Sequence, residues 1–474
     1  MNINKILIPT ILCASAISAF AQQEEIIQCQ CIICTGVLET PVQNKQQPTP
    51  QTNRNKPKVQ KTSVQNTQQT TSNEKCQHQC DTFNYPYGNF GLDCISNHIN
   101  ALKQKLANDT GISPFFNYYA DAFTNVEGGR KNGANYTHIM EYGVNVDMNK
   151  IAGIKGGSFT ISGAYNAGKD LSGQIGNFYT ISESAVTDGG MFYEMFYSQN
   201  ISLPWDDTIN ISLGRMSMSN TFASLPVFGY LSSGSIDSTP EGIFYASPYT
   251  SSTIATWGIA VEYQTSNNLS FAYGLYQVVS NQQSSNWDGL DWGISHNDGY
   301  MMMAQVQWSP TFCGNLQGTY QFGGYFFDGF DMPKLSNQNS FRENGYGFYL
   351  QAQQMVWADS TNQNRNITLW AGSQYAPIQT ISPIHWQLYA GVQFQGFVPH
   401  RENDSIFVSW TTGFFSNDYN NGNSTEETLF EVNYLWQVNS NIAIQPTMQF
   451  VLNPNGNSQI NDAIVLGGQI TVSF

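Results

Sequence analysis

Hydrophobic and polar residues alternate over the last three-quarters of this chain, in stretches separated by clusters of turn residues. The pattern is clearest at the C-terminus, where Leu466, Ile470 and Phe474 fall on one face of an extended chain and Gln469 and Thr471 on the other. A period of two is typical of β-strands whose two faces meet different surroundings. A shift of one residue would place glutamine on the apolar face, so the pattern strongly specifies the register of each strand.

Sixteen stretches with this pattern follow one another after residue 111. They are 112–123, 135–148, 157–166, 191–202, 207–216, 253–265, 268–278, 299–309, 315–327, 345–358, 366–375, 385–397, 405–415, 427–438, 441–452 and 463–474. A closed antiparallel barrel of the bacterial outer membrane requires an even number of strands. The pattern therefore predicts an all-β fold, a 16-stranded antiparallel transmembrane β-barrel (a porin fold) over residues 112–474.

The lengths of the connections support a barrel, because such proteins join their strands by short periplasmic turns and longer outer loops. If Phe474 lies on the periplasmic side, every connection after an even-numbered strand should be short. The connections at 266–267 and 439–440 are short, whereas 217–252, after the fifth strand, has 36 residues.

Composition fits a chain that lies between lipid and water. Only 11% of the residues are charged, against about 25% in typical soluble proteins, yet the mean hydropathy is −0.32. After the first twenty residues no window holds the 18 consecutive apolar residues of a membrane-spanning helix, which excludes helical membrane proteins. Residues 111–474 carry ten Lys or Arg and 27 Asp or Glu. This net charge of −17 excludes a nucleic-acid partner and should attract cations to a channel.

Residues 1–21 have the features of a signal peptide. Lys5 precedes an apolar stretch at 6–20, and small residues form an A-x-A cleavage site at its end. A membrane anchor is the alternative, but the stretch is short and contains Pro9. We expect export to the outer membrane of a Gram-negative bacterium, with a mature chain that begins at Gln22.

Residues 22–94 are expected to form a cysteine-bearing periplasmic extension and linker. Six cysteines lie in it: Cys29, Cys31, Cys34, Cys76, Cys80 and Cys94. Their spacing could suit zinc, but an exported protein meets an oxidising compartment, so we favour disulfides of open connectivity. With Cys313 the mature chain has seven cysteines, an odd number. Either one thiol stays unpaired or a cysteine of the extension forms a disulfide with Cys313. The segment 40–73, rich in Gln, Thr, Asn and Pro, predicts disorder, and its basic residues are either solvated or in contact with the cell wall.

One short helix is expected at 95–111, between the linker and the first strand. Ile95, Ile99, Leu102 and Leu106 have helical spacing, and Gly111 is a stop signal.

Several short stretches carry a family likeness. They are 151–159, 192–199, 213–216, 256–258, 444–456, 462–467 and the final Phe474. In this order and spacing they resemble the carbohydrate-selective porins of the OprB family, and the likeness covers nearly everything from Gly91 to the C-terminus. The resemblance implies a sixteen-stranded outer-membrane porin through which monosaccharides such as glucose and other small hydrophilic solutes diffuse passively.

The chain departs from the family pattern in two places. The extension from Gln22 to about Asp93 is not part of the usual pattern. Family members commonly place arginines at the sugar-binding constriction, whereas this barrel is poor in arginine. Its arginines are Arg130, Arg215, Arg342, Arg365 and Arg401.

The connection at 217–252 is long enough to fold into the lumen and narrow it. It carries aromatic rings and carboxylates, namely Phe222, Phe228, Tyr230, Phe244, Tyr245, Tyr249, Asp237 and Glu241. Such a mixture suits sugars, whose C–H faces pack on rings while their hydroxyls bond to carboxylates, and binding must stay weak for passage. The alternative is that the aromatic residues only anchor the loop against the inner wall.

Strand parity directs a further set of side chains into the lumen: Glu141, Glu194, Glu262 and Glu431, with Tyr276, Tyr349, Trp370 and Tyr389. Charges cost little in a water-filled channel, so we expect the glutamates to tune selectivity. The alternative is that some of them brace the inner wall through hydrogen bonds. Arg215 has the parity of the lipid face, which a bulge at Gly214 or an interfacial position would explain, and it is a candidate rim or sugar contact.

These features predict a porin for glucose-sized neutral solutes with a modest preference for cations. Its expected partners are outer-membrane lipid and small carbohydrates, without cofactor or metal, and a homotrimer and a monomer both stay open. A general cation-preferring porin without sugar selectivity is the nearest alternative. A rim hydrolase would need residues such as Asp288, Asp291, His296 and Asp298, but no nucleophile motif accompanies them. An outer-membrane anchor, whose extension binds the cell wall, is the structural alternative.

Overall fold

The computed structural model describes residues 92–184, 188–282, 284 and 287–474, apart from the side chains of Cys94, Asp237 and Asn421. The expected signal peptide, nearly all of the extension at 22–94 and the side chains of the six cysteines expected to form disulfides lie outside the described residues.

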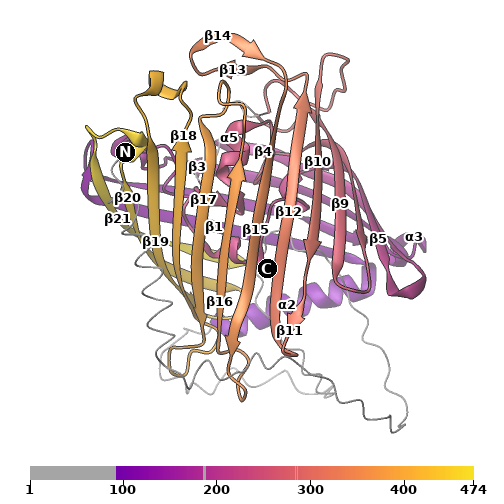
Figure 1. Ribbon diagram of the computed structural model, residues 1–474. Helices are drawn as coiled ribbons and strands as arrows, with labels where there is room; N and C mark the ends of the chain where they lie inside the picture. The colour runs from indigo at the N-terminus through magenta and orange to yellow at the C-terminus, as the bar shows by residue number, and fades with distance from the viewer. Residues whose placement is uncertain (1–91, 185–187, 283, 285–286) are drawn as a thin grey trace, which may run out of the picture. The chain divides into compact units, whose positions relative to one another are not determined.

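Sixteen long antiparallel strands close into a barrel (Figure 1). They are β1 (Ile112–Gly129), β2 (Gly133–Asp147), β3 (Gly157–Gly168), β4 (Gly189–Ser202), β5 (Thr208–Met216), β8 (Thr256–Gln264), β9 (Leu269–Val278), β10 (Gly299–Trp308), β12 (Leu316–Asp328), β15 (Gly345–Ala358), β16 (Asn366–Tyr375), β17 (Ile384–Gln395), β18 (Ser405–Phe415), β19 (Glu426–Gln437), β20 (Ile442–Leu452) and β21 (Asn461–Ser473). Pairing of β1 with β21 closes the sheet. The sixteen expected strands are confirmed, although β1 extends to Gly129 and β8 begins only at Thr256.

The two faces of the wall differ as the alternation requires. In β21, Leu466 and Ile470 point outward and are 43% and 46% exposed, whereas Val465 and Gln469 point inward and are buried. Exposed outward residues continue around the barrel, among them Phe116, Leu213, Phe271, Phe322, Leu350 and Trp386. Soluble proteins rarely expose so continuous an apolar surface. This belt therefore faces lipid.

Short elements occupy the connections. On the periplasmic side they are α3 (Met148–Ala152), η1 (Pro204–Asp206) and β11 (Thr311–Phe312). On the outer side they are α4 (Ser172–Ile175), η2 (Met218–Asn220), η3 (Pro226–Tyr230), β6 (Ile236–Asp237), β7 (Thr239–Pro240), α5 (Glu241–Ala246), β13 (Met332–Lys334), β14 (Asn337–Arg342), η4 (Tyr419–Gly422) and η5 (Pro454–Gly456). We call the outer connections 169–188, 217–255 and 279–298 loops L2, L3 and L4. Figure 1 shows α5, which belongs to L3, between the front and back walls of the barrel.

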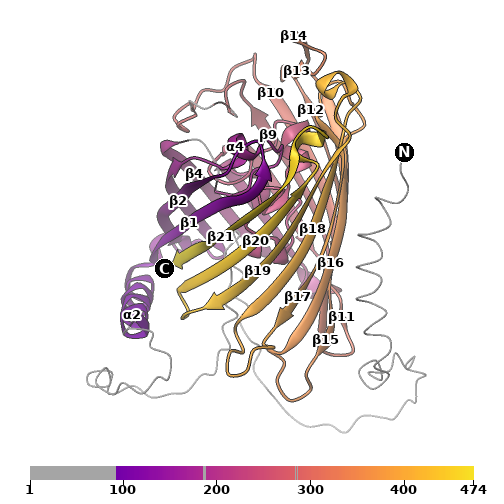
Figure 2. The same ribbon diagram turned by 90° about the vertical axis from the view of Figure 1, so that its left-hand side faces the viewer.

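Helix α2 (Leu92–Thr110) precedes the first strand and lies at the lower left of Figure 2. It begins three residues before the expected range and ends at Thr110, directly before Gly111, whose φ of +77° favours glycine. Asn100 Nδ2 donates to Asn441 Oδ1 at 2.7 Å, and Lys150 Nζ donates to Ala107 O at 2.8 Å. These contacts tie the helix to periplasmic turns. No helix among the described residues is long and apolar enough to cross a membrane.

Candidate functional site

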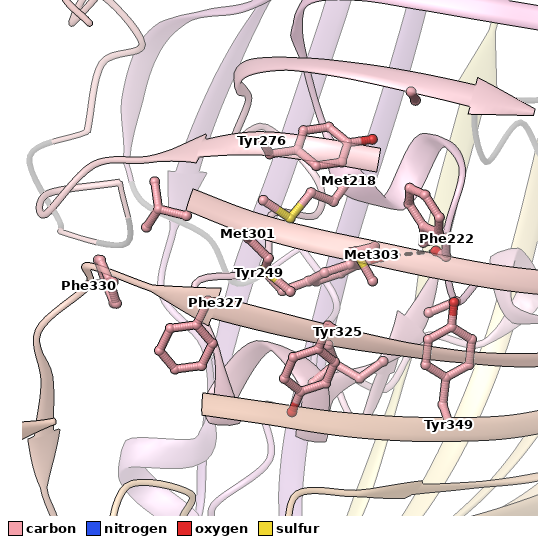
Figure 3. Close-up of a cluster of buried hydrophobic side chains, with 14 of the residues drawn as sticks. Met218, Phe222, Tyr249, Tyr276, Met301, Met303, Tyr325, Phe327, Phe330 and Tyr349 are labelled. Atoms are coloured by element: carbon pink, nitrogen blue, oxygen red, sulfur yellow. Dashed lines mark hydrogen bonds between the residues drawn. The ribbon is translucent and has the colours of Figure 1, made fainter. Parts of the chain in front are cut away.

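L3 folds into the barrel and packs against its inner wall. Met218, Phe222 and Phe228 of this loop are fully buried. Figure 3 shows Phe222 and Tyr249 of L3 among wall residues from β9, β10, β12 and β15. The wall residues of this cluster include Tyr276, Met301, Met303, Tyr325, Phe327 and Tyr349. The loop therefore occupies part of the lumen, as its length led us to expect.

The Glu431 carboxylate on β19 fixes the middle of L3. Its oxygens accept hydrogen bonds from Ser232 N at 3.0 Å and Ser233 N at 2.8 Å. Asn433 Nδ2 and Gln449 Nε2 also donate to it, at 2.6 and 3.2 Å. A buried carboxylate needs several donors, because an unpaired one would be strongly destabilising. Glu431 is thus an anchor for the loop.

Glutamines at inward strand positions hold the rest of the L3 backbone. Gln305 Oε1 on β10 accepts from Ala223 N at 3.0 Å, and Gln321 Nε2 on β12 donates to Ser224 O at 2.9 Å. Gln387 on β17 makes two such bonds, to Ser235 O at 2.8 Å and from Gly242 N at 2.7 Å. An amide can donate and accept at once, so it can pair with an irregular backbone that a carboxylate alone could not satisfy. Sequence reasoning missed this role, although the inward parity of the glutamines was the available signal.

L2 also enters the bore, which the sequence did not predict. Phe178 N and Tyr179 N donate to the Glu427 carboxylate at 2.7 and 2.9 Å, and Ser182 Oγ donates to Asp121 Oδ2 at 2.6 Å. The two loops contact each other directly. Glu183 N donates to Ser232 O at 2.8 Å, and Gly234 N donates to Thr180 O at 3.1 Å.

The expected pore-lining aromatic residues are correctly directed inward but do not meet open solvent. Tyr276, Tyr349, Trp370 and Tyr389 are at most 3% exposed, because L3 covers them. Phe228 packs edge-on against Trp370 and Tyr389, with ring centroids 5.8 Å apart in both pairs. Contrary to our expectation, these four residues are therefore not in contact with the pore solvent. They form the part of the wall on which L3 packs.

The four expected glutamates divide into two pairs. Glu194 and Glu431 are buried, and Glu194 Oε1 accepts from Ser217 N at 3.1 Å and Asn220 Nδ2 at 2.5 Å. Contrary to our expectation, these two glutamates therefore do not meet the pore solvent. They hold L3 against the inner wall through hydrogen bonds. Glu141 and Glu262 are only partly buried and occupy inward positions on β2 and β8.

The expected L3 residues surround helix α5. Glu241, Phe244 and Tyr245 are partly exposed, whereas Tyr249 is fully buried and its hydroxyl donates to Phe222 O at 3.0 Å. Tyr249 is therefore corrected from a solute contact to an anchor of L3. Burial raises the pKa of Tyr245 well above its usual range, and the nearby Glu241 carboxylate adds to the effect, so the phenol stays neutral. The side chain of Asp237 lies outside the described residues.

Arg215 points away from the bore, and L4 covers it. It pairs with Met195 and Trp257 in unbroken register, so the expected bulge at Gly214 is absent from β5. Its guanidinium donates to Asp291 O at 2.6 Å and Ala255 O at 3.0 Å, and lies 5.7 Å from the centre of the Trp287 ring. The side chain is 1% exposed. The expectation that Arg215 contacts sugar is therefore wrong. This residue contacts L4 outside the lumen.

The charged residues at inward strand positions and in L3 are all acidic. Among the described residues, no inward strand position and no position of L3 is occupied by Lys or Arg. The basic residues of the barrel lie in outer loops (Arg130, Lys131, Lys169, Lys334, Arg342), in periplasmic turns (Lys150, Lys155, Arg365, Arg401) or under L4 (Arg215). Inward positions of the strands instead carry Asp121, Glu141, Glu194, Glu262, Glu427 and Glu431.

The carboxylates of L4 serve turns within the loop. Asp288 Oδ1 accepts from Leu290 N at 2.9 Å, and Asp298 Oδ2 accepts from Ser295 N at 2.7 Å. His296 is exposed. Among the described residues no group of three or more His, Cys, Asp or Glu could hold a metal ion. Cys313 is exposed in the turn before β12 and forms no disulfide with another side chain that the structure describes.

Comparison with known proteins gives one family and a matching fold. A family model described as "Carbohydrate-selective porin, OprB family" matches residues 131–474. Porin B of Pseudomonas aeruginosa is 23% identical over 403 residues, which cover 75% of this chain and 86% of that protein. The putative porin QuiX of Acinetobacter baylyi is 22% identical over 396 residues, 75% of this chain and 87% of that protein.

Solved structures support the same fold. The high-pH structure of Pseudomonas putida OprB superposes with a TM-score of 0.72 at 19% identity, covering 79% of this chain and 97% of that one. The low-pH structure of the same protein gives a TM-score of 0.53 at 16% identity, covering 80% and 98%.

Proposed function

Because this chain belongs to the carbohydrate-selective porins of the OprB family, we propose that it passes small neutral sugars and prefers cations to anions. As a member of that family it is an outer-membrane porin, through which carbohydrates diffuse. The observation that carries the proposed preference is the set of inward carboxylates without an inward Lys or Arg among the described residues. Such a field lowers the energy of a cation in the channel and raises that of an anion, but leaves a neutral sugar unaffected.

We place the solute contacts at the carboxylates and rings that stay partly exposed. Glu141 and Glu262 lie on the wall, and Glu241, Phe244 and Tyr245 lie on α5. Sugar C–H groups can pack on the two rings, while hydroxyls donate to the carboxylates. Few such contacts are available at once, which suits a channel because a solute that binds tightly would not leave.

A salt gradient across a planar bilayer tests the charge preference. We expect the reversal potential of potassium chloride to have the sign of a cation-preferring channel. Anion preference, or no conductance, would contradict the proposal. Adding glucose separates sugar contacts from the alternative of a general cation-preferring porin. A sugar that binds in the bore reduces the ionic current saturably and by more than the same glucose concentration lowers the conductivity of the bulk solution, whereas a sugar that makes no contacts lowers both to the same extent.

The family and the fold are those of a channel rather than of an enzyme. We further propose that the chain has no hydrolytic activity, since the L4 carboxylates already serve turns of the loop. In hydrolysis assays the wild type and His296→Ala should therefore give the same rate, which should not exceed that of a protein-free control.

Lipid and small solutes are the partners that a porin of this family requires. We further propose that the chain forms a homotrimer and that residues 22–94 contact the cell wall. Both proposals concern the mature protein, from which the signal peptide at 1–21 has been removed. Native mass spectrometry would test the trimer. Loss of co-sedimentation with cell wall on deletion of 22–91 would test the contact, and the shortened chain should still conduct.

A further inference from the structure

The outer wall of the barrel carries a groove of about 550 Å³ over β2, β3 and β4. Tyr142, Val144, Ile161 and Phe192 line it from strand positions that all point outward. Gly163 and Gly190 also occupy outward positions in it, where they present no side chain. The groove is therefore an apolar depression in the belt that faces lipid.

L4 forms one edge of this groove, because it folds over the outside of the wall. Phe192 N donates to Asp288 O at 2.9 Å, and Trp257 Nε1 donates to Trp292 O at 3.1 Å. Leu290, which borders the groove, is 64% exposed. An apolar residue so exposed on the lipid side of the barrel extends the hydrocarbon-facing surface.

Aromatic and then basic residues follow the groove toward the outer rim. The His138 ring lies between Tyr136 and Tyr165, with centroids 5.5 and 6.0 Å apart. Beyond them, Lys131 and Lys169 are exposed in the first two outer connections. From Gly163 to Lys169 the chain rises roughly 20 Å, which a strand tilt of about 40° reduces to roughly 15 Å along the membrane normal. That is about half the thickness of the hydrocarbon core.

We propose that the groove binds an acyl chain of a phosphorylated glycolipid of the outer leaflet, lipid A, whose phosphate lies beside Lys131 and Lys169. The order of surfaces from the groove outward is apolar, aromatic and cationic, which is the order of acyl chain, interface and phosphate in such a lipid. A second copy of this chain is the less suitable occupant of the groove, because an apolar contact between two copies would not account for the two exposed lysines beyond it.

Native mass spectrometry with added hexa-acylated lipid A tests the proposal on the delipidated full chain in detergent. We expect one bound lipid per chain. Gly190→Leu fills the groove, and a Cβ there meets only the Tyr165 ring, at 3.8 Å, so the side chain fits. This variant should lower lipid affinity at least about tenfold, while its bilayer conductance matches that of the wild type. Ala304→Leu, at an exposed outward position of β10, is the matched control and should bind like the wild type.

A second arm tests the head group. The double variant Lys131→Gln with Lys169→Gln should weaken binding of lipid A but not of its dephosphorylated form. Unchanged affinity in Gly190→Leu, or an equal effect of Ala304→Leu, would overturn the proposal. So would a dimer that Gly190→Leu abolishes while the bound lipid remains, because a second copy would then occupy the groove.

Discussion

Glu427 and Glu431 lie four residues apart on the inner face of β19, and each carboxylate accepts hydrogen bonds from two consecutive backbone N–H groups of a different loop. Glu427 binds L2, and Glu431 binds L3. Both loops meet in the lumen, where Glu183 N donates to Ser232 O. One strand thus positions both loops that enter the bore.

Replacing Glu431 should loosen L3. In Glu431→Ala the N–H groups of Ser232 and Ser233 lose their acceptor, at a cost of about 1–3 kcal/mol for each buried group left unpaired. We expect a larger and noisier single-channel conductance in planar bilayers. Glu426→Ala, on the opposite face of the same strand, is the control and should conduct like the wild type. A quiet, unchanged conductance in Glu431→Ala would show that the loop does not depend on this anchor.

Glu141 should contribute to cation preference. It is partly exposed at an inward position, so Glu141→Gln should lower the permeability ratio of potassium to chloride by roughly twofold to threefold, without changing the flux of glucose. Glu194→Gln should change the ratio less, because that carboxylate is buried and bonds to Ser217 N. Reversal potentials measure both variants. Equal effects of the two substitutions would contradict the division into exposed and bracing glutamates.

Arg215 should matter to L4 and not to transport. Arg215→Met removes the donors to Asp291 O and Ala255 O, so the loop should leave the outer wall more often. We expect faster cleavage by chymotrypsin within 287–294, measured by mass spectrometry, with unchanged conductance. Cleavage at the wild-type rate, or a change in sugar flux, would contradict the placement of this residue outside the lumen.

Tyr349 should contribute stability. Its hydroxyl donates to Gln305 Oε1 at 2.7 Å, and the same oxygen accepts from Ala223 N of L3. Tyr349→Phe should lower the free energy of unfolding by about 0.5–1.5 kcal/mol, and Tyr349→Ala by about 3–5 kcal/mol. Denaturant unfolding in detergent measures both. Tyr346→Phe, on the exposed face of the same strand, should have no effect, and equal losses at the two positions would argue against a packed interior.

Strand parity in the sequence predicted which way most wall residues point, because a period of two leaves only two choices. It fails at a bulge in β4, where Phe192 points outward and Glu194 inward although both have the same parity. Parity does not say whether an inward residue meets solvent. Glu141 and Glu431 have the same parity, yet only Glu431 is covered by L3. The paths of L2 and L4 rest on contacts far apart in the chain, such as Phe178 with Glu427, which no local pattern encodes. Arg215 was the one residue that indicated the path of L4 in the sequence, because a cation with the parity of the lipid face must be shielded from lipid by another part of the chain.

Liposome swelling tests the central claim most directly, that the loops in the bore leave a path for small sugars. Proteoliposomes should swell in isotonic glucose, progressively more slowly in larger neutral sugars, and more slowly in gluconate than in glucose of similar size. Swelling no faster than that of protein-free liposomes, or faster swelling in gluconate than in glucose, would contradict the account.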